Sequence, residues 1–351
     1  MNDTPESAPR VAVAARYARQ ALFSGIGERG QAALAEARVA IVGLGALGAA
    51  SADILARAGV GALRLIDRDV LELTNLQRQV LYDERDLEAG LPKAQAALRR
   101  LGDVNSEISL EAHAVDLVPA NARGLLGDVD LVIDGTDNFE TRLLINDVCL
   151  AQGLPWVYCG VIGASVHSFN IRPGQPPCFR CYLGEVPPPG SVETCDTAGV
   201  LGPTVLVGVG LATMEALKML AGQAESCARG LRVLDLWSGS FRSFELASDP
   251  GCRACQGHYD FLAGAAAPAA RLCGRNAVQL APRDGQRVDL RSLAKRLSPL
   301  GTVTANPFLL RFEPSEWPEG ELTVFPDGRI IIKGTEDFAR ARVLGARYLG
   351  A

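Results

Sequence analysis

The sequence contains little histidine and no cluster of positive charge. Its 351 residues include only three histidines, none of them in a recognisable motif: His113, His167 and His258. A Ser-His-Asp arrangement for nucleophilic catalysis is therefore not expected. The formal net charge is -5 and no long basic run occurs, so no nucleic acid is expected as a partner.

The sequence also lacks segments that would direct it into or through a membrane. Residues 1–10 are polar and acidic, without the basic and apolar regions of a secretory signal. The most apolar stretch, 199–214, is interrupted by glycines and Pro203, and we expect it to be too short to span a bilayer. These features predict a cytoplasmic protein with no membrane partner.

Composition and length indicate a globular chain with more than one part. Hydrophobic residues make up 48% and charged residues 21% of the sequence, as is usual for globular proteins, and the length allows two domains. A run of small apolar residues at 262–270 has the composition of a linker. We predict a flexible tail at 1–15, a main domain at 16–258, a linker at 259–270 and a small module at 271–351.

Strand and helix patterns alternate through the first half of the main domain. Such alternation is typical of parallel strands joined by crossover helices. The fold class expected here is α/β, a Rossmann-like, doubly wound and mainly parallel sheet. Expected strands are 39–42, 63–66, 108–114 and 131–133; expected helices are 48–58, 93–101 and 139–152.

Later segments follow a different pattern. Two pairs of strands with short turns, 156–172 and 232–246, predict antiparallel additions to the sheet, and an apolar helix is expected at 204–220. The module at 271–351 is expected to be α+β. Its predicted elements are helices at 290–297 and 336–348, and strands at 308–312, 322–325 and 329–333.

A glycine turn followed by an acidic residue predicts nucleotide binding. Gly43, Gly45 and Gly48 lie between an expected strand and helix, where they permit backbone N–H groups to approach a phosphate. Asp67 ends the next strand, where a carboxylate can accept both ribose hydroxyls. The alternative is a turn whose glycines serve packing alone, with Asp67 a solvated strand end.

Two cations after the second strand favour ATP over a dinucleotide. Arg78, in the segment 75–79, and Lys93 offer charged donors that suit phosphate groups. An NAD-dependent oxidoreductase explains the turn and Asp67 but gives neither cation a role. Either cation alone would more often be a solvated surface residue.

Two polar residues follow the strand at 131–133, at the sheet edge where ligands bind in such folds. The carboxylate of Asp137 can bind Mg²⁺, and Asn138 can cap the next helix. The alternative for Asp137 is helix capping alone.

Four of the nine cysteines form two C-x-x-C pairs. Two such turns, once brought together, provide four thiolates for a structural Zn²⁺ ion. The alternative is a set of redox or unligated thiols. The four residues are Cys178, Cys181, Cys252 and Cys255.

In combination these motifs resemble the MoeB/ThiF/HesA group of ubiquitin-activating-like adenylyltransferases. The likeness extends from residue 16 to about residue 258, with its motifs in order at fitting spacings. The module around 325–335 resembles the C-terminal extension of some bacterial members, and not the rhodanese domain of others. The matching stretches are 16–20, 42–48, 58–61, 75–79, 90–93, 135–138 and 194–200.

The resemblance implies an enzyme that uses ATP and Mg²⁺ to adenylate the C-terminal glycine of a small ubiquitin-fold sulfur-carrier protein ending in Gly-Gly. Pyrophosphate leaves, and the carrier is activated for thiocarboxylate or thioester formation in molybdopterin synthesis, thiamine synthesis or tRNA thiolation. The absence of a rhodanese-like domain implies a separate sulfur donor. The same motifs would also fit a related ATP-dependent enzyme acting on tRNA, or a scaffold without catalytic activity.

The resemblance also implies roles for individual residues. Asp67 would hold the ribose, Asp137 would bind Mg²⁺, and Arg19 would reach the partner's ATP site in a homodimer. Cys195 would carry the activated carrier covalently, with Cys273 a weaker candidate. The phosphates would contact Asn75, Arg78 and Lys93, and the nucleotide site also includes Gly43, Gly45, Ala46, Gly48 and Asn138. Ala46 stands where the family usually has glycine, which narrows the room for backbone approach.

Overall fold

The computed structural model describes residues 15–188, 191, 193–264, 271–272, 276–280 and 287–349. Most of the predicted tail, part of the predicted linker and Cys273 lie outside the described residues. The chain divides into two compact units, one of residues 1–84 and 93–265, the other of residues 85–92 and 266–351. The predicted main domain, 16–258, includes residues 85–92, but in the structure this segment groups with the C-terminal unit.

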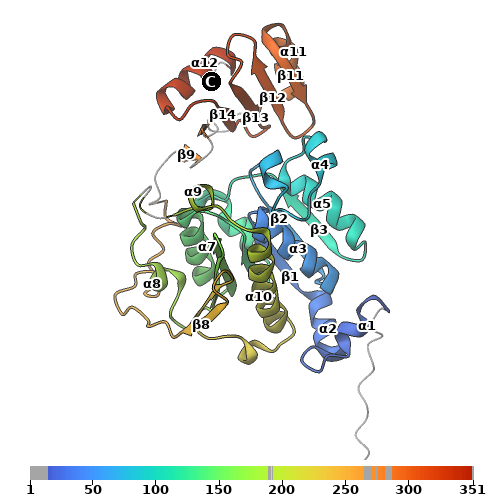
Figure 1. Cartoon of the computed structure of the whole chain (residues 1–351), viewed down its shortest axis with the longest axis vertical. Helices are drawn as coiled ribbons and strands as arrows, with labels where there is room; N and C mark the ends of the chain where they lie inside the picture. Colours follow the sequence, from blue (N-terminus) through green and yellow to red (C-terminus); the bar gives the residue numbers. More distant parts are fainter. Residues whose placement is uncertain are drawn as a thin grey trace, which may run out of the picture. The chain divides into compact units, whose positions relative to one another are not determined.

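The first unit is built on an eight-stranded sheet with the order β3-β2-β1-β4-β5-β6-β7-β8 (Figure 1). Neighbouring strands from β3 to β5 pair in parallel, and those from β5 to β8 pair antiparallel. The doubly wound, mainly parallel sheet with antiparallel additions is thus confirmed. The strands are β1 (Arg38–Val42), β2 (Ala62–Ile66), β3 (Ser109–His113), β4 (Leu131–Asp134), β5 (Trp156–Ile162), β6 (Ser165–Ile171), β7 (Leu231–Asp235) and β8 (Ser240–Phe244).

Helices cover both faces of this sheet. Val39 and Ile41 alternate along β1 with Ala40 and Val42, and all four side chains are buried, so both faces of the strand are covered. In one group α3 packs against α5 and α10, and in the other α6 packs against α7. The helices are η1 (Ala15–Tyr17), α1 (Ala18–Ala21), α2 (Gly27–Glu36), α3 (Ala46–Ala58), η2 (Leu73–Asn75), α5 (Lys93–Val104), α6 (Pro119–Leu126), α7 (Phe139–Gln152), α8 (Phe179–Leu183), α9 (Cys195–Ala198), α10 (Gly202–Leu220) and η3 (Ala224–Ser226).

The apolar helix α10 extends beyond residues 199–214, the stretch that was expected to be too short to span a bilayer. It continues to Leu220, and its 19 residues are long and apolar enough to cross a bilayer by length and composition alone. The expectation concerned residues 199–214, whereas the helix that meets this criterion is Gly202–Leu220, which ends where the apolar helix was predicted to end. Core helices pass the same test, and α10 packs against α3, β5 and β6.

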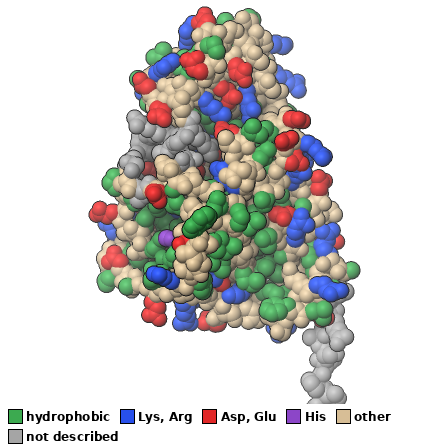
Figure 2. All heavy atoms as spheres, viewed as in Figure 1, with side chains coloured by type: hydrophobic (Ala, Val, Ile, Leu, Met, Phe, Trp, Pro, Cys, Tyr) green, Lys and Arg blue, Asp and Glu red, His purple; other side chains and the backbone are tan. Residues whose placement is uncertain are grey.

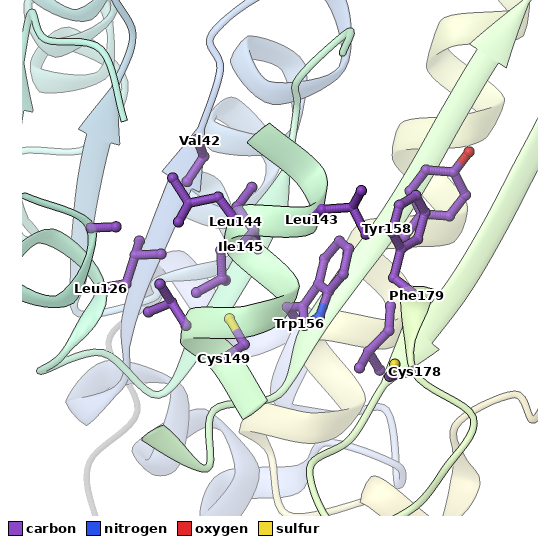
Figure 3. Packing of buried hydrophobic residues seen from close by; sticks show 14 of the residues in the cluster. Val42, Leu126, Leu143, Leu144, Ile145, Cys149, Trp156, Tyr158, Cys178 and Phe179 are labelled. Carbon is purple, nitrogen blue, oxygen red and sulfur yellow. The ribbon is translucent and has the colours of Figure 1, made fainter. Parts of the chain in front are cut away.

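The core between the sheet and α7 joins the sheet's parallel and antiparallel parts. Leu143 and Leu144 of α7 lie between Val42 of β1 and the aromatic side chains near β5 (Figure 3). Trp156 and Phe179 are fully buried there, with ring centroids 5.5 Å apart. This packing fixes the position of α7, whose first residues border the candidate site.

The second unit has an antiparallel sheet with the order β11-β12-β13-β14-β10-β9. Leu293 and Leu297 pack with Phe312, Leu322 and Tyr348 in its core. The sequence did not predict β10 or β11. The elements are α4 (Glu84–Glu88), which runs into this unit, β9 (Arg271–Leu272), β10 (Ala277–Leu280), α11 (Leu290–Leu297), η4 (Ser298–Leu300), β11 (Gly301–Ala305), β12 (Leu310–Pro314), β13 (Glu321–Val324), β14 (Ile330–Lys333) and α12 (Phe338–Leu349).

Candidate active site

The glycine turn lies at the carboxyl end of β1, directly before α3. Gly43 has a φ of 83°. A Cβ atom at Gly48 would lie 1.8 Å from the Gly43 carbonyl oxygen, so packing alone requires glycine at both positions. Gly45 differs, because the nearest atom to a Cβ there is Gln79 Nε2 at 3.8 Å. The turn thus leaves room beside Gly45 and Ala46 at the N-terminus of α3, where anions are favoured.

Asp67 is a buried carboxylate fixed against the glycine turn, not a solvated strand end. It is 7% exposed. Its Oδ2 accepts a hydrogen bond from Leu44 N at 2.6 Å, and its Oδ1 accepts one from Asp69 N at 2.6 Å. Burial raises the pKa of Asp67, and the positive charge of Lys93 opposes that rise. The carboxylate is therefore preorganised next to the turn.

Lys93 is also buried, which excludes a solvated surface role for it. It is 2% exposed and begins α5. Its backbone N–H donates to Asp69 O at 2.8 Å, and its Nζ lies 3.4 Å from Asp69 Oδ2. The cation is thus held at the carboxyl end of β2, on the same sheet edge as the glycine turn.

The segment 75–79 folds back toward the turn. Asn75 is buried and its Oδ1 accepts from Glu72 N at 3.1 Å, so this oxygen shapes its own loop. Arg78 Nη1 donates to Thr74 O at 2.9 Å. Gln79 is 3% exposed, and among the described residues its Oε1 has no hydrogen-bond partner. Gln79 was not predicted as a site residue, although it lies in the recognised motif and next to Gly45.

The loop after β4 brings Asp137 to the same edge. Asn138 caps α7, because its Oδ1 accepts from Thr141 N at 2.9 Å. Asp137 is exposed, and it interacts electrostatically with Arg68 and Arg142. The capping role that was the alternative for Asp137 therefore belongs to its neighbour.

A buried ion pair that the sequence analysis missed supports this loop. Arg142 Nε lies 3.0 Å from Asp134 Oδ2, and Thr136 N donates to Asp134 Oδ1 at 2.8 Å. Burial raises the pKa of Asp134, although Arg142 opposes the rise. The sequence indicates only that Asp134 ends an apolar strand. It does not indicate that Asp134 pairs with Arg142, which lies eight residues later on a helix.

Cys195 begins the short helix α9 and lies at this edge too. Its Sγ donates to Val161 O at 3.1 Å, near the carboxyl end of β5. Gly163 N donates to Gly199 O at 2.9 Å, which holds the end of α9 against the turn after β5. Since β5 is parallel to β4, Cys195 and Asp137 share one edge of the sheet.

Arg19 is not brought to the site of its own chain. It is exposed on α1. Its neighbour Gln20 donates from Nε2 to Ala58 O at 2.9 Å, at the last residue of α3. The glycine turn precedes the first residue of α3, so this anchor is roughly 18 Å away along the helix.

The four C-x-x-C cysteines do come together. Their Sγ atoms lie within 4.8 Å of one another, so the cluster could hold a metal ion. Tetrahedral coordination with Zn–S bonds of about 2.3 Å requires S–S distances of about 3.8 Å. The Cys178–Cys252 and Cys181–Cys255 distances are 3.7 and 3.6 Å. Cys178 follows β6, whose last residue pairs with Trp156 at the start of β5, so the cluster lies at the sheet edge opposite the nucleotide turn.

Comparison with known proteins agrees with this arrangement. The model of the ThiF family matches residues 17–254. The chain belongs to the ThiF family. A ThiF-family relative from Bacillus subtilis, the sulfur carrier protein ThiS adenylyltransferase, is 41% identical over 340 residues, which cover 95% of this chain and 99% of the relative.

Other relatives match about two thirds of this ThiF-family chain. The sulfur carrier protein adenylyltransferase of Thermus thermophilus is 38% identical over 245 residues, which cover 68% of this chain and 90% of the relative. The crystal structure of Escherichia coli MccB with ATP superposes with a TM-score of 0.59 at 24% identity, covering 69% of this chain and 74% of that chain. That likeness shows a shared fold.

Proposed function

We propose that the protein uses ATP and Mg²⁺ to adenylate the C-terminal glycine of a small ubiquitin-fold sulfur-carrier protein. The observation that carries this proposal is that Asp67 and Lys93 are both buried at the sheet edge of the glycine turn, where Asp67 accepts from Leu44 N and interacts electrostatically with Lys93. A dinucleotide site needs the acid and the turn but has no use for a buried lysine there, so ATP is favoured over NAD. The family membership of the chain supports the same activity.

The chain's own residues supply binding and charge in this reaction. The triphosphate would lie at the N-terminus of α3, with the ribose on Asp67 and the phosphates near Arg78 and Lys93. A carboxylate oxygen of the carrier's terminal glycine attacks the α-phosphorus, and the bond to the β-phosphate oxygen breaks to release pyrophosphate. Positioned cations stabilise the charge that develops, so no protein nucleophile is needed.

Magnesium fits the donor set at this edge. Asp137 is exposed there, and a carboxylate oxygen is a ligand that Mg²⁺ prefers. The ion would neutralise charge on the phosphates when bound. Asp137 would hold it, with Asp134 and Arg142 keeping the loop in place.

A carrier of the ThiS kind is the first candidate substrate. The Bacillus subtilis ThiS adenylyltransferase aligns over nearly its whole length, including the second unit. In the proposed pathway the acyl-adenylate goes on to a thiocarboxylate or thioester, with sulfur from a separate donor, and the protein acts in the cytoplasm. Molybdopterin synthesis and tRNA thiolation remain the alternative pathways.

We assign the four-cysteine cluster to a structural Zn²⁺ ion. Its sulfur distances suit tetrahedral zinc, and structural zinc sites of this kind are closed by four thiolates. The cluster's position at the opposite sheet edge supports a role in folding and not in catalysis.

A homodimer completes the proposed site. The helix that carries Arg19 is anchored at the far end of α3 through Gln20, so we infer that a second copy supplies Arg19 to the nucleotide. An apolar surface supports such an association: Leu206 and Met214 on α10 are 48% and 51% exposed. Figure 2 shows hydrophobic side chains gathered on the face that carries α10.

Pyrophosphate exchange tests the activity directly. Purified protein is mixed with ATP, Mg²⁺, labelled pyrophosphate and a ThiS-type carrier, and label entering ATP is counted. We expect exchange that requires the carrier's terminal glycine and falls by at least about a hundredfold in Lys93→Ala, the loss of more than about 2.7 kcal/mol of transition-state stabilisation. Stable NAD binding with no exchange for any carrier would contradict the proposal.

A covalent role for Cys195 is a separate part of the proposal. Its sulfur lies at the carboxyl end of β5, on the sheet edge where the activated carrier terminus would lie. Cys195→Ser is expected to keep pyrophosphate exchange while transfer of the carrier onward stops. Unchanged sulfur transfer by the variant would rule the covalent role out.

A further inference from the structure

Arg68 is a charged residue at the candidate site to which neither the sequence motifs nor the proposed chemistry gives a role. It directly follows Asp67 and its side chain is 21% exposed. Its Nη1 donates to Asp116 Oδ2 at 3.0 Å, and its Nε lies 3.8 Å from Asp69 Oδ1. These two carboxylates hold the guanidinium between the ends of β2 and β3.

The position of Arg68 separates it from the phosphate end of the site. The glycine turn follows β1, whereas Asp116 follows β3, two strands away in the sheet order. At a strand spacing of about 4.8 Å, the anchor of Arg68 lies roughly 10 Å across the sheet edge from the turn. A nucleotide with its phosphates at α3 and its ribose on Asp67 would place its base near this anchor.

We propose that Arg68 recognises the adenine base, with its guanidinium plane against the face of the ring. This inference rests on the proposed use of ATP. Arginine stacks on aromatic faces, and its planar group is preorganised when carboxylates hold it. Asp116 is itself positioned, since its backbone oxygen accepts from Asn121 Nδ2 at 2.8 Å.

Electrostatics argue against a phosphate ligand for Arg68. Asp116 and Asp69 already balance its charge, and Asp137 also interacts with it. A ribose 2′-phosphate, as in NADP, would face the adjacent carboxylate of Asp67, and the two negative charges would repel. A neutral aromatic base meets no such opposition.

The test compares ATP with inorganic tripolyphosphate, which has phosphates but no base. Dissociation constants are measured by calorimetry on the full chain with Mg²⁺, without carrier. In Arg68→Ala we expect the Kd for ATP to rise about tenfold while that for tripolyphosphate changes less than about twofold. Arg68→Lys should lie between, because lysine keeps the charge and loses the plane. Arg57→Ala, on the exposed side of α3, is the matched control and should change neither.

Kinetics provide a second readout. In pyrophosphate exchange, Arg68→Ala should raise KM for ATP about tenfold and leave kcat within about twofold, a pattern that a purely structural role would not produce. Arg68→Gln replaces Arg68→Ala if thermal denaturation shows that the alanine variant is unfolded.

Two results would overturn the inference: equal weakening of the binding of ATP and of tripolyphosphate, or an unchanged Kd for ATP. If the wild type binds ATP but shows no pyrophosphate exchange with any carrier, the proposed adenylation activity is wrong. The dissociation constants for ATP and tripolyphosphate still decide the role of Arg68 in that case.

Discussion

Two glycines of the same turn have different physical reasons to be glycine. Gly48 has no room for a side chain, since a Cβ would overlap the Gly43 carbonyl oxygen. A Cβ at Gly45 would overlap no described protein atom, so a side chain there would compete only with a bound ligand for space. The motif therefore combines a requirement of the fold with a requirement of function.

Alanine substitutions should separate the two requirements. We expect Gly48→Ala to unfold the first unit or lower its stability by more than about 3 kcal/mol, as overpacking against backbone does. Gly45→Ala should cost about 1 kcal/mol or less as an N-cap change and weaken ATP binding at least about tenfold. Denaturant unfolding and calorimetry with ATP measure the two effects.

Gly102 offers a control within the same unit. Gly102 lies inside α5, and a Cβ at this position meets no atom of the described part of the chain within 4 Å. Gly102→Ala should therefore stabilise the protein by up to about 1 kcal/mol and leave ATP binding unchanged. If Gly45→Ala binds ATP as tightly as the wild type, the phosphates do not approach this turn.

Much of the site could be predicted at this scale because its residues follow strand ends in sequence. Asp67 and Asp137 each come after an apolar strand, and parallel strands place their carboxyl ends at one edge. The burial of Lys93 could not be predicted, because it depends on how the backbone of Asp69 meets the start of α5. The pairing of Asp134 with Arg142 likewise depends on the docking of α7.

At the scale of elements, a buried carboxylate on α10 joins this helix to the antiparallel strands. Glu215 Oε2 accepts from Asn170 Nδ2 at 2.6 Å and from Ala228 N at 2.7 Å. Its Oε1 lies 2.8 Å from Lys218 Nζ and 3.2 Å from Arg232 Nη1. Burial alone would raise the pKa of Glu215, but Lys218, the Ala228 amide and Arg232 outweigh it, and the pKa is lowered.

Glu215→Gln should therefore destabilise the protein in a pH-dependent way. At pH 7 we expect a loss of about 2–3 kcal/mol, since hydrogen bonds to a charged group are lost. The lowered pKa means that this contribution is complete above the ordinary glutamate value of about 4.3 and is lost as the pH falls through the lower folded-state value. Urea unfolding at pH 7 and at pH 3.5 measures the difference between variant and wild type. A difference that grows at acid pH would contradict the assigned network.

The cysteine cluster connects α8 to the end of the first unit, so metal loss should act on stability. Cys252→Ser is expected to reduce bound zinc below about 0.2 per chain and lower Tm by several degrees. Cys227→Ser, outside the cluster, should keep its zinc. Elemental analysis and thermal denaturation make the comparison. Because the cluster lies at the sheet edge opposite the nucleotide turn, the Cys252→Ser variant should still bind ATP at temperatures below its Tm. A folded variant that no longer binds ATP would argue against a purely structural role for the metal.

The elements show where sequence patterns fail. The strands β1 and β2 were predicted to within one residue because short apolar runs are bounded by turns. The end of α10 at Leu220 was predicted, but the apolar stretch considered as a membrane span stopped at Met214, because the next residue is the charged Glu215. That charge is neutralised inside the fold. Pairings distant in sequence, such as segment 85–92 with the C-terminal unit, leave no local pattern to read.

At the scale of the whole molecule, the position of Arg19 is the basis for the proposed homodimer. Its helix is anchored to the C-terminal end of α3, and the nucleotide turn lies at the other end. If a second copy supplies Arg19, then each site of a dimer contains Lys93 from one chain and Arg19 from the other. Inactive variants at these two positions should then complement each other.

We expect Arg19→Ala and Lys93→Ala each to lose pyrophosphate exchange, and a mixture of the two to regain it. In a randomly mixed dimer, half of the molecules combine one variant of each kind, and each such molecule has one intact site, so recovery approaches about a quarter of wild-type activity. Lys93→Ala mixed with Asp67→Ala is the matched control and should stay inactive, because those two residues act in the same site of one chain.

Disrupting the apolar face of α10 should abolish the complementation. Met214→Glu places a charge on a helix face that would be desolvated in the dimer, which costs several kcal/mol, so the variant should elute as a monomer and lose exchange activity without losing its fold. Exchange activity in the mixture that survives Met214→Glu would mean that a different surface joins the chains. Full activity of Arg19→Ala alone would mean that Arg19 takes no part in the reaction, and the case for a shared site would then fail at its first step.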